Sequence, residues 1–590
     1  MVNGPIYLPT SAHDSAPKRR SASRWAFSAF ALLAVLATTT WSFGSVTLVA
    51  TGVNVAPSCE QAKPIMPEGY NLSGIYDEKE QIIDWLSGAI KIPTQIYDEM
   101  GPVDEDPRWK PLGDFHEYLE KSFPLVHQHL ERTIVDWALV YEWKGSDESL
   151  KPVFLTAHQD VVPVLESTLG QWEQPPFSGY YDGTKIWGRG ASDTKGSLIA
   201  IMGAIEHLLK STDFKPTRSV ILGFGSDEER GGQVGAPAIA KFLLGKYGKD
   251  SMSLLIDEGS GMINTWGQQF AVPGVAEKGH YDLGISVETL GGHSSVPPPH
   301  TGIGLMSLLI AELEKNPHPL VLEEASPMYG FVTCAADYAE DMPKGLRSTV
   351  KKAGKGDKKA WSNLAQDIVD TGIPGQSHGP GQGDPIRALM STTQATDIIN
   401  GGVKVNALPE VVTAVVNHRV NVASNHVELQ DRTISTLMPV VKKYNLTLVG
   451  FGETVHTGGA SKVVLSNAYG YYTDPAPISP FTIDDPAWKV MAGTARGMWA
   501  SRPEVSDNGA IVELPQGEDL VMAPFFTTGN TDTRRYWDLT RSIYRFRYFD
   551  MSAGSGAHTI NEWTTADNLV EFTRWYAAII LTMDQAKDVA

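Results

Sequence analysis

Short apolar runs that alternate with helical patterns are the feature that most limits the folds open to this 590-residue chain. Strand-like runs lie at residues 153–157, 218–224 and 253–256, and a helical pattern covers residues 198–210. Continuous apolar strands that alternate with helices are typical of a sheet covered by helices on both faces. Residues 61–282 therefore predict an α/β fold.

The pattern changes at about residue 283. Residues 283–288 and 411–416 have the alternation of strands with one exposed face, residues 427–444 have a helical pattern, and residues 446–449 form another apolar run. This order predicts a small α+β unit inserted into the larger domain. The predicted boundaries are 61–282 and 461–590 for the two parts of the larger domain and 283–460 for the inserted unit.

Residues 340–386 of the inserted unit are rich in Gly, Pro and Lys. Such a composition favours a solvated insertion, and a basic ligand site is the less favoured alternative. No internal repeat is present in the sequence.

The formal charge of -19 argues against non-specific nucleic-acid binding, which needs Lys and Arg to neutralise phosphates. The two cysteines, Cys59 and Cys334, lie far apart and form no C-x-x-C pair, so the sequence predicts no disulfide framework. A metal ion in this protein would therefore be held by His, Asp and Glu.

The N-terminal region has no charged residue from position 25 to position 58. Positive residues precede this run at Lys18, Arg19, Arg20 and Arg24. Since basic flanks stay cytoplasmic, we predict a cytosolic tail over 1–24, a single-pass signal anchor over 25–55 and a lumenal catalytic domain. A cleaved signal peptide is the alternative. Asn71 and Asn445 each begin an N-x-S/T sequon that a lumenal domain could use.

Potential metal ligands follow the three predicted strands or precede a helix. These residues are His158, Asp160, Asp193, Glu228, Glu229 and Asp257. Ligands of open α/β sheets sit beyond the carboxyl ends of the strands, so these segments point to one crevice. A pair of metal ions needs His nitrogens for affinity and carboxylates to bridge and to balance charge. Each signal is weak alone, and the ordered combination is what predicts a two-metal hydrolase.

Two of these acidic positions suit supporting roles. Asp160 shares a strand face with His158 and could orient its ring through the second nitrogen, as carboxylates near zinc commonly do. The adjacent Glu228 and Glu229 offer one ligand and one free carboxylate for proton transfer.

Four motifs in this order resemble the glutamate carboxypeptidase and aminoacylase family of cocatalytic zinc hydrolases. They are His-x-Asp at 158–160, Gly-Ala-Ser-Asp-x-Lys-Gly at 190–196, Asp-Glu-Glu at 227–229 and Asp-Glu-Gly at 257–259. Gly-Asn-Thr-Asp-Thr-Arg at 529–534 is similar to the branch of fungal vacuolar Gly-X carboxypeptidases. The likeness spans about residues 70–580.

The resemblance implies a mixed-sheet catalytic domain with an inserted lid and two zinc ions per subunit. Asp193 would bridge the ions, His158 and Asp257 would complete one site, and Glu229 and His558 the other. Many relatives have Asp where this chain has Thr194, next to a peptide bond that is often cis in the family.

The resemblance also implies the catalytic and substrate groups. Glu228 would be the general base and then the general acid, and Asp160 would orient His158. His293 would stabilise the oxyanion. The groups that would bind the substrate are Asn406, Arg419, Asn530 and Thr531.

The implied activity is zinc-dependent hydrolysis of the C-terminal amide bond of short Gly-X peptides by metal-activated water. An N-acyl amino acid hydrolase or synthase is the alternative, because both substrates share an amide and a free carboxylate. A non-catalytic binding protein is a remote alternative, and Arg419 argues against an aminopeptidase. The implied location is the vacuole, or alternatively outside the cell. The resemblance also implies a homodimer, and the 340–386 insertion argues against it.

Overall fold

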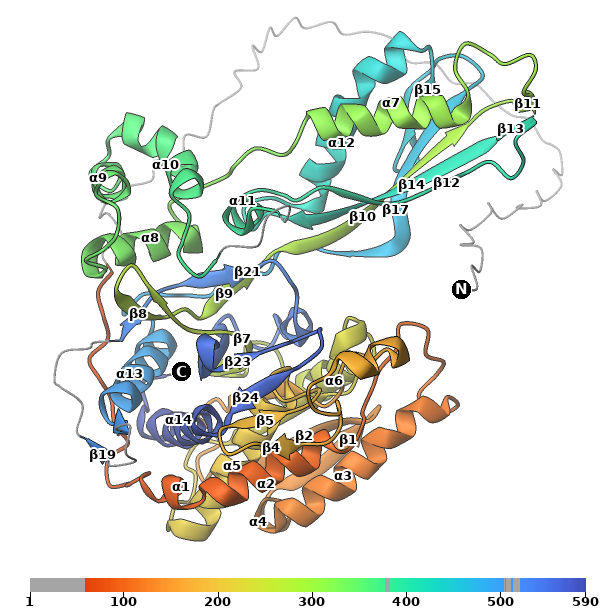
Figure 1. Cartoon of the computed structure of the whole chain (residues 1–590). Coiled ribbons are helices and arrows are strands. Elements are labelled where there is room, and N and C mark those ends of the chain that lie inside the picture. Colours follow the sequence, from red (N-terminus) through yellow and green to blue (C-terminus); the bar gives the residue numbers. More distant parts are fainter. Residues whose placement is uncertain (1–58, 377–382, 503, 506–510, 513–519, 590) are drawn as a thin grey trace, which may run out of the picture. The chain divides into compact units, whose positions relative to one another are not determined.

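The computed structural model describes residues 59–376, 383–502, 504–505, 511–512 and 520–589 (Figure 1). The predicted cytosolic tail and signal anchor, residues 1–24 and 25–55, lie outside these ranges. None of the helices in the described ranges is both long and apolar enough to span a bilayer.

The larger domain is built on a mixed sheet, which confirms the predicted α/β class. Its main path runs β1 (Glu131–Val135), β2 (Ala138–Trp143), β6 (Val220–Gly225), β3 (Val153–His158), β7 (Leu254–Thr265), β22 (Ile543–Asp550), β9 (Gly274–Glu277) and β21 (Phe525–Thr527). The strands β8 (Gln268–Ala271) and β20 (Val521–Met522) extend it. Strand β3 pairs in parallel with β6 and β7, whereas β1, β2 and β6 pair antiparallel. The three parallel neighbours are the three strands predicted from the sequence.

Helices cover both faces of this sheet (Figure 1). The helices α2 (Lys79–Ile90), α5 (Lys195–Ser211), α13 (Pro486–Ala500) and α14 (Ala566–Gln585) pack on one face, and α6 (Gly235–Tyr247) packs on the other. Leu155 and Leu222 belong to the first apolar cluster, and their neighbours Phe154 and Ile221 to the second. Successive side chains of a strand point to opposite faces, so continuous apolar strands fill both clusters.

A separate four-stranded sheet joins two distant parts of the chain. Its order is β23 (Gly554–Ser555), β24 (Trp563–Thr565), β5 (Lys185–Trp187) and β4 (Tyr180–Tyr181). Because β24 pairs with β5, the loop after β5 and the loop between β23 and β24 lie side by side.

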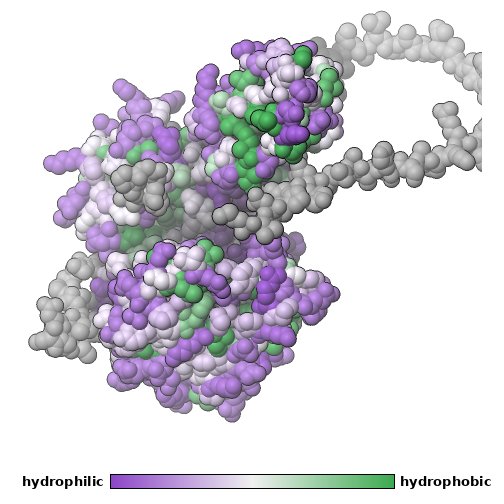
Figure 2. All heavy atoms as spheres, turned by 45° about the vertical axis from the view of Figure 1, so that its right-hand side comes forward, coloured by the Kyte–Doolittle hydropathy of each residue, from purple (hydrophilic) through white to green (hydrophobic). Residues whose placement is uncertain are grey.

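The inserted unit, which we call the lid, contains a six-stranded sheet. The order is β12 (Ala395–Gly401), β14 (Val411–Val420), β10 (Gly279–Glu288), β17 (Lys462–Thr473), β15 (Thr447–Gly450) and β16 (Glu453–His456). Helices α7 (Gly302–Lys315) and α12 (His426–Lys443) pack on its apolar face. The sheet extends past position 460, because β17 pairs with β10. Large apolar side chains, including Leu290 and Val403, are exposed on the lid, and Figure 2 shows apolar residues on its surface.

The expectation of a solvated insertion over 340–386 is wrong for most of that segment. Residues in it form α9 (Lys344–Ala353), α10 (Lys358–Thr371) and the start of α11 (Pro385–Met390), which pack with α8 (Pro327–Tyr338). Leu346 and Val350 of α9 and Leu364 and Ile368 of α10 are buried at four-residue spacing. The lysines lie on the solvent-exposed faces of these helices. Both helices are therefore amphipathic, although the composition of the segment suggested a loop.

The two cysteines form a disulfide bond, although the sequence predicted no disulfide framework. Cys59 and Cys334 are bonded across a sequence separation of 275 residues. The bond ties the start of the described chain to α8. The remaining elements are α1 (Gly74–Asp77), α3 (Lys110–Ser122), α4 (Pro124–His129), β11 (Gly292–His293), β13 (Ala407–Leu408), β18 (Glu504–Val505) and β19 (Ile511–Val512), with short 3-10 helices η1 (Pro107–Trp109), η2 (Glu166–Gln171), η3 (Glu228–Arg230), η4 (Asp532–Arg535) and η5 (Met551–Ala553).

Candidate metal centre and substrate cavity

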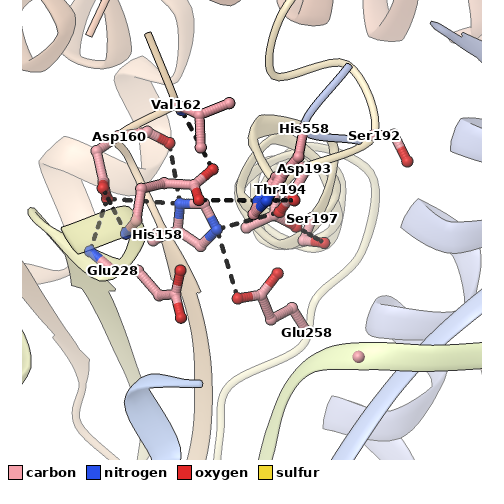
Figure 3. A network of polar contacts seen from close by, with 12 residues as sticks. His158, Asp160, Val162, Ser192, Asp193, Thr194, Ser197, Glu228, Glu258 and His558 are labelled. Carbon is pink, nitrogen blue, oxygen red and sulfur yellow. Dashed lines mark hydrogen bonds and ion pairs between the residues drawn. The ribbon is translucent and has the colours of Figure 1, made fainter. Parts of the chain in front are cut away.

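Side chains from five segments converge beyond the carboxyl ends of the central strands (Figure 3). His158 ends β3, Glu228 and Glu229 lie in η3 after β6, and Glu258 lies in β7. Asp193 precedes α5, and His558 lies in the loop between β23 and β24. The four-stranded sheet brings these last two loops together.

Asp193 lies between the two histidines. His158 Nε2 is 3.3 Å from Asp193 Oδ1 and 3.4 Å from Glu258 Oε1. His558 Nε2 is 3.1 Å from Asp193 Oδ2 and 2.9 Å from Glu229 Oε2. Each oxygen of Asp193 thus faces a different histidine, which is the arrangement that a carboxylate bridging two cations requires.

The donor set fits divalent cations. His158 Nε2 is buried and has no hydrogen-bond partner, whereas its Nδ1 contacts the Asp160 carbonyl oxygen at 2.9 Å. Potential ligand atoms lie within 4.8 Å of one another in two overlapping groups: His158, Asp193 and Glu229, and His158, Glu228 and Glu258. Histidine nitrogen and carboxylate oxygen are the ligands of catalytic zinc sites, and transition metals such as cobalt or nickel also accept them.

The structure corrects one predicted ligand, because Glu258 takes the place assigned to Asp257. Asp257 is buried and is in neither group of potential ligands; its Oδ1 accepts a hydrogen bond from Thr156 Oγ1 at 3.2 Å, and its Oδ2 has no hydrogen-bond partner. The pairing register of β7 with β22 shifts after Asp257, and Gly259 has a positive φ of 141°. Regular strand alternation is interrupted at this irregularity, and Glu258 Oε1 comes to 3.4 Å from His158 Nε2. Burial, followed by the charge of Glu258, raises the pKa of Asp257 to about 7.

Asp160 supports the site in a different way from the one predicted. Its main-chain carbonyl, rather than its carboxylate, makes the shorter contact with His158 Nδ1, at 2.9 Å against 3.4 Å. The carboxylate instead accepts hydrogen bonds from the backbone N–H groups of Glu228 and Glu229, at 3.1 and 3.0 Å. Asp160 therefore fixes the turn that carries the candidate base.

Glu562 is a residue next to the candidate metal centre that the sequence did not indicate. Its Oε1 accepts hydrogen bonds from the backbone N–H groups of Ser192 and Asp193, at 2.8 and 2.9 Å, and its Oε2 pairs with Arg189 at 2.7 Å. It holds the turn of the bridging aspartate, where the Asp193–Thr194 peptide bond is cis. Only the fold places it there, since 369 residues separate it from Asp193.

Burial raises the pKa of the adjacent carboxyl groups Glu228 and Glu229. Burial and then the charge of Glu258 raise the pKa of Glu228 well above its ordinary value. Burial also raises the pKa of Glu229, to about 7, against the lowering effect of its hydrogen bond to His558. Carboxyl groups with raised pKa values in a cleft are suited to accepting and returning protons.

A cavity of about 600 Å³ adjoins the metal centre, and both the lid and the larger domain line it. Arg419 of β14 lies opposite His280 in the strand register, at the end of the lid sheet that joins the larger domain. This register brings Arg419 Nη1 to 3.5 Å from Asn530 Oδ1, and Asn530 Nδ2 donates to the Lys278 carbonyl oxygen at 2.7 Å. Two of the predicted substrate groups, Arg419 and Asn530, therefore meet in the cavity.

The other predicted substrate groups do not line this cavity. His293 and Asn406 are exposed at the two-stranded sheet of β11 and β13, where the Asn406 carbonyl oxygen accepts from the Ser294 N–H at 3.2 Å. The Thr531 hydroxyl lies 2.7 Å from that of Thr533 and caps η4. In this arrangement Thr531 shapes the turn after Asn530, and the pairing of β11 with β13 holds His293 and Asn406 near each other, outside the cavity.

Residues 154–582 match the model of Peptidase family M20/M25/M40. The chain is 38% identical to Carboxypeptidase S of Saccharomyces cerevisiae, over 86% of this chain and 85% of the yeast protein. It is 30% identical to the N-fatty-acyl-amino acid synthase/hydrolase PM20D1 of Mus musculus, over 87% of this chain and 90% of the mouse protein. Human carnosine dipeptidase 1 has a similar fold, with a TM-score of 0.52 at 15% identity over 87% of this chain and 98% of that protein.

Proposed function

This chain belongs to Peptidase family M20/M25/M40, and we propose that it is a zinc-dependent carboxypeptidase that hydrolyses the C-terminal amide bond of short peptides of the Gly-X type. The observation that carries the proposal is the buried, unpartnered Nε2 of His158 facing Asp193 and Glu258. The adjoining cavity contains Arg419, whose guanidinium suits a free carboxylate through parallel hydrogen bonds.

The residues of the site have different roles in the proposed reaction. His158, Asp193, Glu258, Glu229 and His558 would hold two zinc ions, which polarise a scissile carbonyl and make an attacking water more acidic. Glu228 takes the proton of the attacking water and passes it to the leaving amine.

The surrounding residues position these groups. Asp160 keeps the Glu228 turn in place through two backbone hydrogen bonds. Arg419 and Asn530 hold the substrate carboxylate at the far side of the cavity, so that the amide bond of a C-terminal residue reaches the metal centre. This geometry supports removal of one residue from the carboxyl end.

The second candidate activity is hydrolysis or synthesis of N-acyl amino acids, favoured by the similarity to the mouse synthase/hydrolase over 87% of this chain. A peptide and an N-acyl amino acid present the same carboxylate to Arg419 and the same amide to Glu228. A non-catalytic binding protein is disfavoured, because the described cluster retains both histidines and all four carboxylates.

We also propose a single-pass anchor over 25–55 with the catalytic domain on the lumenal side, in the vacuole or alternatively secreted. The Cys59–Cys334 bond supports an oxidising compartment, where disulfides persist. The sequon residues Asn71 and Asn445 are exposed and so accessible to glycosylation. A homodimer and the absence of nucleic-acid binding stay predictions.

The test is hydrolysis of a panel of Gly-X dipeptides and N-acyl amino acids by the purified lumenal domain. A chelator should abolish activity and added zinc should restore it. Glu228→Gln should retain zinc and lose turnover. An enzyme that cleaves both classes equally well with the metal removed would contradict the proposal.

A further inference from the structure

The charged side chains that line the cavity beside the metal centre are mainly basic. The basic side chains that line the cavity, apart from His558, are Arg230, His280, Arg419, Arg534 and Arg535. Its acidic lining residues are Glu228 and Glu229, both at the metal centre. A concave surface with this charge distribution attracts an anionic group to the basic side chains.

Most of these basic groups already have structural partners. Arg535 Nε donates to the Gly232 carbonyl oxygen at 3.0 Å, and His280 Nε2 lies 3.3 Å from Asp282 Oδ2. The guanidinium of Arg230 lies over the Trp109 ring at 5.9 Å, although its Nε, like that of Arg534, is buried without a hydrogen-bond partner. These contacts orient the three side chains without a ligand.

Arg534 has no such partner. Its Nε is buried without a hydrogen-bond acceptor, and the described residues contain no carboxylate within ion-pair distance of its guanidinium. The guanidinium of Arg534 lies close to Gly231: a side chain at this position would place its Cβ 2.9 Å from Arg534 Nη2. The guanidinium therefore packs against the turn that carries Glu228.

Arg534 and Arg419 approach the cavity from different parts of the fold, η4 of the larger domain and β14 of the lid. Burial lowers the pKa of Arg419, Asp282 opposes this effect, and the positive charge of Arg534 lowers it further. Two like charges beside one cavity repel each other, and an anion between them removes the repulsion.

We propose that Arg534 is a second carboxylate-binding residue, which holds the substrate's free carboxylate together with Arg419 from the opposite side of the cavity. The inference rests on the proposed function and adds a specificity-determining residue to it. The carboxylate would link the lid to the larger domain, so that substrates without a C-terminal negative charge bind weakly. A guanidinium hydrogen bond to a carboxylate is charge-assisted and stronger than a neutral one.

The experiment compares N-blocked glycyl-leucine with its C-terminal amide, using zinc-loaded wild-type enzyme and three variants. Arg534→Gln should raise KM for the acid by roughly 10- to 100-fold, the value of one or two such hydrogen bonds, with kcat changed less than about threefold. Its kcat/KM for the amide should stay within about threefold of wild type. Arg534→Lys should recover part of the loss, since lysine keeps the positive charge but lacks the paired N–H donors of the guanidinium.

Arg230→Gln is the charge-matched control, because it removes one positive charge from the same cavity at a side chain that lies over Trp109. It should change the acid and the amide by the same factor. If Arg534→Gln does not fold, as judged by thermal unfolding, Arg534→Lys decides by its KM for the acid, which must rise several-fold at unchanged kcat.

The inference is overturned if Arg534→Gln leaves KM for the acid unchanged or lowers kcat/KM for acid and amide equally. If wild type does not cleave the amide measurably, the KM for the acid decides alone. Failure of zinc-loaded wild type to cleave any N-blocked dipeptide or N-acyl amino acid would instead contradict the proposed function, so the two failures are distinguishable.

Discussion

Exchange of single acids in β7 tests which residue of the Asp257–Glu258 pair holds a metal ion. The perturbations are Glu258→Gln and Asp257→Asn, which remove one charge each from adjacent positions and preserve side-chain shape. Glu258 Oε1 lies 3.4 Å from the unpartnered His158 Nε2, whereas Asp257 bonds to Thr156 at 3.2 Å. We expect Glu258→Gln to lose one zinc ion per chain and Asp257→Asn to keep both.

The magnitude follows from the contacts. Groups that only orient a ligand change metal affinity by about 10- to 100-fold, so loss of a carboxylate that directly faces the cation should weaken binding by at least roughly 100-fold, or about 3 kcal/mol. The asparagine of Asp257→Asn keeps an oxygen for the Thr156 hydroxyl, so its effect on stability should be within about 1 kcal/mol.

Zinc per chain, measured by mass spectrometry after dialysis against buffered zinc, gives the occupancy, and titration with a chelator gives the affinity. Wild type and Asp257→Asn should each retain two zinc ions. Glu258→Gln should retain one, and its second site should bind added zinc only weakly. Two retained ions in Glu258→Gln together with loss of zinc from Asp257→Asn would refute the assignment of Glu258 as a ligand.

Three further outcomes are expected. Glu228→Gln should lower kcat by roughly 100- to 10,000-fold at unchanged zinc content, measured by steady-state kinetics and metal analysis, and retained activity would exclude Glu228 as the base. Replacing Cys334 by Ala should lower the free energy of unfolding by about 2–4 kcal/mol in denaturant titration, because it removes the bond to Cys59; an unchanged midpoint under non-reducing conditions would contradict this. Burial lowers the pKa of His318 to about 3 and that of His418 to about 4, and both lie below the ordinary value of 6.5. The folded state therefore binds fewer protons than the unfolded chain, so stability is full above pH 6.5 and falls by roughly 1 kcal/mol per pH unit for each histidine towards pH 4. Thermal unfolding of His418→Gln should show a smaller acid slope, and an equal slope would argue against a buried neutral ring.

The sequence indicated those parts of the molecule that depend on local pattern. Apolar continuity predicted the strands that end at His158 and before Glu228, because a strand buried on both faces needs apolar side chains at every position. The predicted ligand was Asp257 rather than Glu258, because the irregularity of β7 after Asp257 is not visible in the apolar pattern. The residue that holds the Asp193 turn, Glu562, is defined only by the pairing of β24 with β5.

The helical insertion was missed for a different reason. The prediction for 340–386 used composition, which is rich in glycine and lysine. It did not use the helical periodicity of the apolar residues, such as Leu346 and Val350 four positions apart. The disulfide was missed because sequence separation carries no information on spatial distance, and the fold brings Cys59 to α8.

The pairing of β24 with β5 also sets the time at which the protein can become active. His558 and Glu562 are made late in synthesis, and both act on a turn centred on Asp193, which emerges from the ribosome several hundred residues earlier. A nascent chain that has completed β3, β6 and β7 contains every candidate ligand except His558 and lacks Glu562, which holds the Asp193 turn. Hydrolysis should therefore begin only after the C-terminal segment has been translated and paired, which a truncation ending before Gly554 would reveal by its reduced zinc content.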